Sequence, residues 1–540
     1  MTKFRSISVL ITLLFICASL LALTPGNVRV RAANDVSAPP PNIRVTPPAP
    51  VFADKDRVAE LAQRRERVAQ SMGPQSFMIL FSTEPRVYAN DVDYPYRQEN
   101  NLYYLTGLKQ KGATLVLLPG NTKTREILFM PRRNPLAETW TGHMYSPEEA
   151  IQLSGIREIW QSSEFEPFLK ALRNRQPYRP KPEDILMSDQ PATTTLSNDN
   201  GYQALFDAAA KNDAGLYLLM PGAADSREYK QEQRFAADWA QTASGYSVKN
   251  AWPIFSQMRL VKSPMEQRLM QHAVDISIEA HQRAWAMAGT AKWEYEVDAI
   301  MAYTFKLRNA DNWGYPDIVG CGPNATTLHY IESQGPVKPG DLLLMDVGAE
   351  YDHYSADVTR TFPVNGKFNP QQAEVYQIVY AAQEAVAAAA KPGAMLSDVN
   401  RAGTDVVKDG LLKLGLITDK NSLQQSRVWF MHGTSHWLGM NVHDVGGPSR
   451  IVPGVVFTNE PGIYVRPDAL DQMPFGWKQE DWDKFKAAVR PAFEKYKGIG
   501  VRIEDDLLIT PEGVKWMTEG LPRKLSDVED FIAKARHPSE

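Results

Sequence analysis

The first half of the chain alternates short apolar runs with stretches of helical periodicity. The runs at 77–81, 113–118 and 126–130 have the length of buried strands, and helical patterns begin near Asp56 and Pro147. Strands that alternate with helices are typical of a layered α/β domain, because each helix covers one face of the sheet. The pattern therefore predicts an α/β N-terminal domain over residues 55–250.

The second half has longer helical patterns. Ser263-Pro264-Met265-Glu266 combines a cap residue, a proline at the first helical position and an acid in the first turn, which predicts a long helix ending near Met287. Further helices are expected at 293–309, 370–390 and 397–415, strands at 341–349, 356–364, 455–465 and 500–509, and an insertion at 466–498 with a helix over 480–496. This pattern predicts an α+β C-terminal domain over residues 251–525 and a C-terminal tail at 526–540.

A different pattern precedes both domains. Two basic residues are followed by an apolar run over about 7–23 and by a cleavage site that ends at Ala32. This order is typical of a secretory signal peptide, here residues 1–32, so the protein is expected to be exported and periplasmic or secreted. An uncleaved membrane anchor is the alternative, although the run is short for a span. Residues 33–54 are rich in proline and are expected to form an extended linker.

Charge and cysteine content exclude several classes of function. Residues 1–32 hold four of the 59 basic residues and none of the 63 acidic ones, so their removal changes the formal net charge from −4 to −8. A negative chain of this kind is not expected to bind nucleic acid, and no stable membrane span is expected after signal cleavage. Cys321 is the one cysteine outside the signal peptide, which excludes an intramolecular disulfide and a multi-cysteine zinc site.

Two aspartates follow or precede apolar strands in the second half. The apolar run at 342–345 ends in Asp346, and Asp357 comes eleven residues later, just before a second strand pattern. If the two segments form a hairpin, both carboxylates can point toward one place. Taken singly, each aspartate is also compatible with a role as a turn cap.

A histidine cluster and two glutamates add to this set. Three of the nine histidines, His432, His436 and His443, fall within twelve residues. Glu460 follows a strand pattern and precedes Pro461, and Glu504 comes two residues after Arg502, on the same face of a strand. Imidazole is a common metal ligand and proton shuttle, although a single histidine or glutamate is more often structural.

Together, four carboxylates and one imidazole form a hard, oxygen-rich ligand set. Such a set suits Mn²⁺ or a similar divalent ion better than a metal that prefers thiolates. Four carboxylates repel one another unless positive charge lies between them, so two divalent ions are the natural arrangement. Two ions can stabilise the transition state of acyl or phosphoryl transfer, which predicts a two-metal hydrolase.

The same residues resemble a known family. The order and local context of Asp346, Asp357, His436, Glu460 and Glu504, with Tyr354-Ser-Ala-Asp357-Val-Thr-Arg and His432-Gly-Thr-Ser-His436-Trp, resemble the pita-bread metallopeptidases. The runs at 93–107 and 138–142 resemble the N-terminal domain of Xaa-Pro aminopeptidases (aminopeptidase P). The resemblance covers about residues 55–520 and implies a C-terminal catalytic domain with the pseudo-twofold pita-bread fold.

The resemblance also implies roles for individual residues. Asp346 would bind one metal ion, His436 and Glu460 the other, and Asp357 and Glu504 would bridge both. A bridging hydroxide would cleave the N-terminal Xaa-Pro bond of peptides with proline at the second position. The implied roles of the remaining residues are proton transfer by Glu460, stabilisation of the tetrahedral intermediate by His443, substrate positioning by His329, a proline-pocket wall at His432, and orientation of the bridging carboxylates by Arg502.

Other interpretations share parts of this pattern. Prolidase, which cleaves Xaa-Pro dipeptides, has the same site, whereas a non-catalytic pita-bread binding module or a creatinase-like hydrolase would be expected to lack the five ligands. Relatives of this type are commonly dimers or tetramers, so a homo-oligomer is expected. Asn441 stands where relatives often have Asp, and Tyr330, Trp437 and Tyr464 are candidates for the proline pocket.

Overall fold

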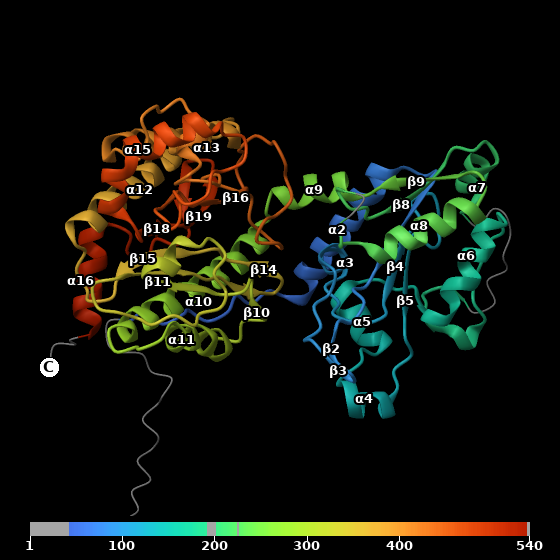
Figure 1. Cartoon of the computed structure of the whole chain (residues 1–540). Coiled ribbons are helices and arrows are strands. Elements are labelled where there is room, and N and C mark those ends of the chain that lie inside the picture. The colour runs from blue at the N-terminus through green and yellow to red at the C-terminus, as the bar shows by residue number, and fades with distance from the viewer. Residues whose placement is uncertain (1–42, 192–200, 224–225, 537–540) are drawn as a thin grey trace, which may run out of the picture.

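The chain folds into two domains connected by a short helix. The computed structural model describes residues 43–191, 201–223 and 226–536, and the expected signal peptide lies outside these residues. Helix α9 (Trp252–Leu260) runs between the domains (Figure 1). Among the described helices, none combines the length and the apolar character that a bilayer span requires.

The N-terminal domain is built on a mixed seven-stranded sheet with the order β7-β6-β5-β4-β1-β8-β9. Its strands are β1 (Ser76–Phe81), β4 (Thr114–Leu117), β5 (Glu126–Met130), β6 (Ile159–Gln161), β7 (Ile185–Met187), β8 (Ala214–Leu218) and β9 (Tyr246–Asn250). A separate small hairpin consists of β2 (Val87–Ala89) and β3 (Val92–Asp93). The three strands predicted from the apolar runs are β1, β4 and β5, and they pair antiparallel with β4 in the middle.

Helices cover both faces of this sheet. They are α2 (Asp54–Met72), α3 (Asn100–Thr106), α5 (Pro147–Ser154), α6 (Phe165–Arg173), α7 (Gln203–Ala210) and α8 (Lys230–Thr242), whereas α4 (Pro135–Thr141) buries none of its residues. Met78 and Leu80 of β1 pack with α2, α3 and α5, whereas Phe77 and Ile79 pack with α6, α7 and α8. Since successive side chains of a strand point to opposite faces, one apolar run supplies two cores. The predicted α/β layer domain is therefore observed.

The first half of the C-terminal domain consists of two long helices and two small antiparallel sheets. Its helices are α10 (Pro264–Ala288) and α11 (Glu294–Leu307), and its strands are β10 (Asn312–Trp313), β11 (Ile318–Cys321), β12 (Leu342–Asp346), β13 (Ala349–Tyr351), β14 (Tyr354–Ser355) and β15 (Thr359–Pro363). The sheet orders are β10-β13-β14 and β11-β12-β15. Helix α10 begins with the predicted cap, in which Ser263 and Glu266 form a reciprocal capping box.

The second half repeats the plan of two long helices over short antiparallel strands. Its helices are α12 (Pro370–Ala389), α13 (Leu396–Leu414), α14 (Leu423–Ser426) and α15 (Gln479–Tyr496), and its strands are β16 (Val456–Asn459), β17 (Gly462–Tyr464), β18 (Gly500–Arg502), β19 (Asp505–Thr510) and β20 (Gly513–Trp516). Each of the strands predicted at 455–465 and 500–509 is divided in two, at Glu460 and at Glu504. Helix α15 lies in the predicted insertion.

Both ends of the described chain pack on the C-terminal domain. The segment predicted as a tail contains most of helix α16 (Leu525–Arg536), whose Val528 and Ile532 are buried in the same core as α10, so the packed domain extends to residue 536. The described part of the proline-rich linker lies along α10, where Thr46 donates its backbone N–H and its hydroxyl to Glu279 at 2.7 Å each. This linker is therefore docked before α2 begins.

The docked linker predicts a measurable contribution to stability. Thr46→Ala removes one hydrogen bond to the buried Glu279 carboxylate and should lower the free energy of unfolding by about 1–3 kcal/mol, because hydrogen bonds to charged groups contribute that much. Urea unfolding of the purified protein measures the difference. Thr139→Ala, which removes an exposed threonine of α4, is the matched control and should change stability by less than about 0.5 kcal/mol. Equal effects of the two variants would show that the linker contact adds nothing.

Candidate metal centre

The two predicted aspartates meet because their segments pair as antiparallel strands. Asp346 is the last residue of β12 and pairs with Thr359, the first residue of β15. Asp357 lies two residues before β15, and Val347 donates its backbone N–H to the carbonyl of Val358 at 3.0 Å. The expected hairpin is thus observed, with the smaller β13–β14 hairpin at its end. Both carboxylates are buried at the end of the pair.

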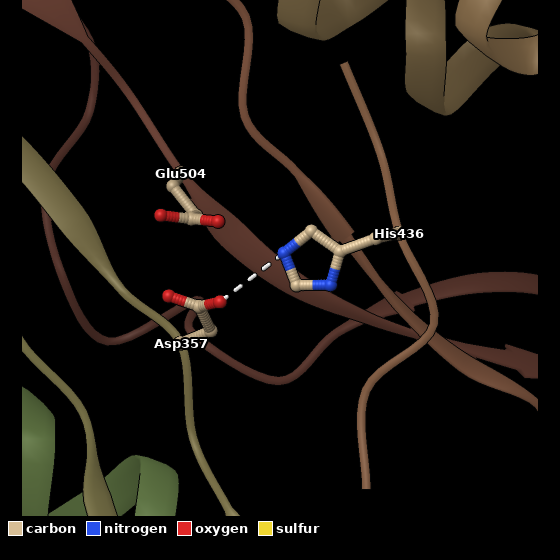
Figure 2. Close-up of side chains that lie close together, drawn as sticks. All are labelled: Asp357, His436 and Glu504. Carbon is tan, nitrogen blue, oxygen red and sulfur yellow. Dashed lines mark ion pairs between the residues drawn. The ribbon is translucent and has the colours of Figure 1, made fainter. Parts of the chain in front are cut away.

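Three ligand types converge on one point beside this hairpin. Asp357, His436 and Glu504 each offer an atom such that all three atoms lie within 4.8 Å of one another (Figure 2). The Nε2 atom of His436 lies 3.3 Å from Asp357 and 3.4 Å from Glu460. These residues are far apart in the sequence, so the site exists only in the folded domain.

Both glutamates lie where a strand is interrupted. Glu460 follows β16 and precedes Pro461, which has no N–H to donate to a neighbouring strand. Glu504 separates β18 from β19, and its N–H donates to the carbonyl of Thr359 at 3.0 Å. Both interruptions place the side chain in the centre of the domain, where Glu504 is 2% exposed.

Arg502 contacts two of the site carboxylates, one directly and one through a hydroxyl group. Its guanidinium forms an ion pair with Asp346 and donates to the hydroxyl of Thr359 at 3.1 Å. The hydroxyl of Thr359 in turn donates to Glu504 at 2.7 Å. Arg502 therefore holds two of the predicted ligands in a defined orientation, directly for Asp346 and through Thr359 for Glu504.

Tyr315 also belongs to the site and was not predicted from the sequence. Its hydroxyl donates to the Oδ1 atom of Asp346 at 2.6 Å. It lies between β10 and β11, in a segment without hydrophobic periodicity or a chemical motif, so local sequence offers no signal for it. Pairing of β11 with β12 is what brings it to Asp346.

Three of the carboxylates are destabilised as anions. Burial and the charges of Asp357, Glu460 and Asp346 raise the pKa of Glu504 well above its ordinary value. Burial, with the charge of Asp357 added, raises the pKa of Glu460 to about 7, although His436 opposes the shift. Burial also raises the pKa of Asp346 despite Arg502. Such a set requires protons or metal cations, and its oxygen-rich donors with one imidazole fit divalent ions.

The histidines differ in their surroundings. Burial lowers the pKa of His436, but its contact with Asp357 and the charge of Glu460 outweigh burial and raise this pKa to about 9. Burial and the charge of Arg502 lower the pKa of His432 to about 3, so this ring is neutral. The ring of His443 stands perpendicular to that of His436, with centroids 4.4 Å apart. His329 is exposed, and its charge makes a small contribution to the lowered pKa of both His432 and His443.

The predicted site residues therefore lie in one region of the C-terminal domain and differ in their solvent exposure. Asp346, Asp357, Glu504 and Arg502 are buried, whereas the side chains of His432, His436 and Glu460 are 16–22% exposed and His329 and His443 are exposed. Among the pocket candidates, the hydroxyl of Tyr464 contacts both His432 and Arg502 at 2.8 Å. Tyr330 instead donates to Glu294 at 2.8 Å, and Trp437 packs in an apolar cluster with Phe457.

Comparison with known families matches both domains. Residues 268–511 match the model of metallopeptidase family M24, and residues 61–179 match the aminopeptidase P N-terminal domain. The first match contains all five proposed ligands. Together they agree with the two-domain arrangement and the pita-bread fold that the resemblance implied.

Individual relatives extend over most of the chain. The Xaa-Pro aminopeptidase of Haemophilus influenzae is 34% identical over 88% of this chain and 97% of its own length. Human Xaa-Pro aminopeptidase 3 is 30% identical over 87% of this chain and 83% of its own. The structure of aminopeptidase P from E. coli with the inhibitor Pro-Leu superposes with a TM-score of 0.71 at 30% identity, and the match covers 90% of this chain and 100% of that one.

Sequence, domain order and fold thus lead to one family. Relatives at this identity match nearly from end to end, and both domain types are present in the expected order. A buried cluster of carboxylates with one histidine lies at the centre of the family domain. The chain belongs to the Xaa-Pro aminopeptidases of metallopeptidase family M24.

Proposed function

We propose that the protein is an aminopeptidase that hydrolyses the N-terminal Xaa-Pro bond of peptides with two divalent metal ions. The observation that carries the proposal is the convergence of Asp357, His436 and Glu504 within 4.8 Å, beside Asp346 and Glu460. The named relatives are Xaa-Pro aminopeptidases, and a similar structure has been determined with Pro-Leu bound as an inhibitor. Prolidase activity is the alternative, since it requires the same ligands.

Mn²⁺ is the proposed ion. Asp346, Asp357, His436, Glu460 and Glu504 would hold two ions, because four carboxylates and one imidazole suit hard divalent cations. When bound, such ions lower the pKa of water and polarise a carbonyl group. The ordered contacts of Arg502 and Thr359 with Asp346 and Glu504 support this assignment, since ligating carboxylates are commonly oriented by further hydrogen bonds.

The remaining polar groups have positions that suit proton transfer and charge stabilisation. Glu460, with a pKa of about 7, is the proposed group that accepts a proton from the attacking water and passes it to the leaving nitrogen of proline. His443, on the open side beside His436, is proposed to stabilise the oxyanion of the tetrahedral intermediate. His329 is proposed to position the substrate carbonyl.

The restriction to the peptide N-terminus is proposed to come from Asp346, which would contact the free amine. The proline ring would lie against the neutral ring of His432, which packs between Phe430 and Tyr464 with ring centroids 5.1 and 5.5 Å away. A neutral, partly buried imidazole flanked by aromatic rings presents a largely apolar wall. Such a wall suits a substrate ring without polar atoms.

Two further proposals concern the location of the enzyme and its oligomeric state. The basic start, apolar run and cleavage site of residues 1–32 support export to the periplasm or the exterior. A dimer or tetramer is proposed because relatives of this type commonly form one.

Substrate length distinguishes the two peptidase alternatives. The Mn²⁺-loaded protein should release the first residue of an Xaa-Pro-Xaa tripeptide and leave the matching Xaa-Pro dipeptide largely intact. Amino-acid release from both peptides, measured side by side, tests this. Cleavage of the dipeptide in preference to the tripeptide would make the protein a prolidase, and hydrolysis of neither would contradict the proposed function.

Glu460→Gln tests the proposed proton transfer. The amide keeps the size of the side chain but cannot accept a proton, so kcat for tripeptide hydrolysis should fall by about 10²- to 10⁴-fold. Metal content and the melting temperature are measured on the same preparation, to separate loss of chemistry from loss of metal. The matched control is Glu480→Gln on the surface of α15, which should retain full activity. Wild-type kcat in Glu460→Gln would exclude the assigned role.

The pKa of His436 predicts a pH dependence of stability for the metal-free protein. Its folded-state pKa, about 9, lies above the ordinary 6.5, so its contribution to stability is complete below pH 6.5 and is lost as pH rises through 9. The melting temperature of the metal-free protein should therefore fall between pH 7 and pH 9. With Mn²⁺ bound, the ion replaces that proton and the decline should be smaller. If the melting temperature falls equally with pH in both forms, His436 does not bind the proton and the metal ion at the same ring nitrogen.

A further inference from the structure

The segment that carries His443 is held from two directions. On one side, the Asp444 carboxylate accepts from Arg259 at 2.6 Å and from Lys262 at 3.4 Å. Arg259 belongs to α9, and both side chains of the Arg259–Asp444 pair are 1% exposed. On the other side, Met440 and Asn441 face the N-terminal domain. His443 lies between these two anchors, is exposed, and contacts the ring of His436 with centroids 4.4 Å apart.

Asn100 of the N-terminal domain makes the second anchor. It is the first residue of α3, and it is 8% exposed. Its amide nitrogen donates to the carbonyl of Met440 at 3.2 Å and also to the side-chain oxygen of Asn441. Its amide oxygen accepts from Arg97 at 2.8 Å. Both ends of this amide are therefore used, and its orientation is defined.

Arg97 strengthens the same contact. It donates to the carbonyl of Met440 at 3.0 Å, and it pairs with Glu350 of β13 at 2.6 Å. Glu350 is 4% exposed and the Arg97 side chain is 39% exposed, so this ion pair lies at the edge of the domain interface. The hairpin β13–β14, to which Glu350 belongs, leads directly to the ligand Asp357.

The turn of that hairpin also contacts the N-terminal domain. Asp352 forms an ion pair with Arg57 at 2.5 Å, and the ring of His353 stacks on Tyr103 with centroids 3.9 Å apart. The Nδ1 atom of His353 lies 3.4 Å from the amide oxygen of Asn100. One residue of the N-terminal domain therefore touches both the segment with His443 and the hairpin before Asp357.

We propose that Asn100 is a positioning residue for the hydrolysis reaction, acting through Met440 and Asn441 on the placement of His443. The inference rests on the proposed function, in which His443 stabilises the oxyanion. The N-terminal domain thereby helps to position a catalytic side chain of the C-terminal domain. A displacement of about 1 Å in such a group can reduce the rate by about 10²-fold, so the amide contact has a measurable consequence.

Replacing each amide by a carboxylate, singly and together, tests the contact between Asn100 and the segment that precedes His443. Asn100→Asp keeps the shape and the bond from Arg97 but replaces the donor with an oxygen, which faces the carbonyl of Met440 and repels it. Asn441→Asp keeps an oxygen acceptor opposite the Asn100 amide. The double variant places two carboxylates against each other. The expected order of kcat is therefore wild type close to Asn441→Asp, then Asn100→Asp, then the double variant.

The experiment measures kcat and KM for an Xaa-Pro-Xaa tripeptide with each Mn²⁺-loaded variant. Asn100→Asp should lower kcat at least about tenfold with KM within about twofold, because His443 is assigned to the intermediate rather than to substrate binding. The double variant should lose more than the product of the single losses. Asn365→Asp is the matched control, since Asn365 is exposed and uses only its side-chain oxygen, toward the N–H of Lys367.

Hydrogen exchange of the amides at 437–446 gives a second readout that does not depend on activity. Exchange should rise in Asn100→Asp and stay at the wild-type level in Asn441→Asp. If Asn100→Asp does not fold, Asn441→Leu removes the side-chain acceptor from the other side and should give a smaller loss of kcat with unchanged KM. An inactive wild type would refute the proposed function, and the exchange data would still decide the positioning role.

Three results would overturn the inference. Wild-type kcat and exchange in Asn100→Asp would show that the contact does not place His443. Equal losses in Asn441→Asp and Asn100→Asp would indicate a general effect of negative charge near the metal centre. A change in KM alone would assign Asn100 to substrate binding instead.

Discussion

Mutual repulsion among buried carboxylates is the constraint on which this structure depends. Asp346, Asp357 and Glu504 are each under 10% exposed and lie beside Glu460, with Arg502 as their cationic neighbour. Burial, with this repulsion added to it, raises the pKa of Asp346, Glu460 and Glu504. A fold that holds such a set together is stable when protons or metal cations supply the missing positive charge, so the metal requirement follows from the packing itself.

The short strands of the C-terminal domain are arranged to deliver these side chains. A continuous strand would point every second side chain toward the same face, and its backbone groups would be used for pairing. Interruptions at Glu460 and Glu504 instead release one residue from each strand at the centre of the domain. The antiparallel pairing of β12 with β15 brings Asp346 and Asp357 to the same end. Helices α10 and α12 pack against the strands of the two halves of the domain.

The N-terminal domain is coupled to this centre by polar contacts. Arg97, Asn100 and Tyr103 reach the segments before Asp357 and around His443, and the buried Arg259–Asp444 pair fixes the connection between the domains. Hydrogen bonds and ion pairs that are shielded from solvent have restricted geometry, so they define relative position more narrowly than an apolar contact of the same area. The interface is thus suited to placing catalytic groups accurately.

Local sequence determined the elements and their chemistry, because strand and helix periodicity, caps and ligand types depend on neighbouring residues. The helix from Ser263, strands β1, β4 and β5, and the ligand set around His436 were all predicted in this way. Tertiary structure decided what depends on distant pairing: the division of two predicted strands at Glu460 and Glu504, the role of Tyr315 at Asp346, the packing of α16, and the contact of Asn100 with Asn441 across 341 residues. No local pattern encodes such contacts, since each arises from the mutual orientation of two separately folded segments.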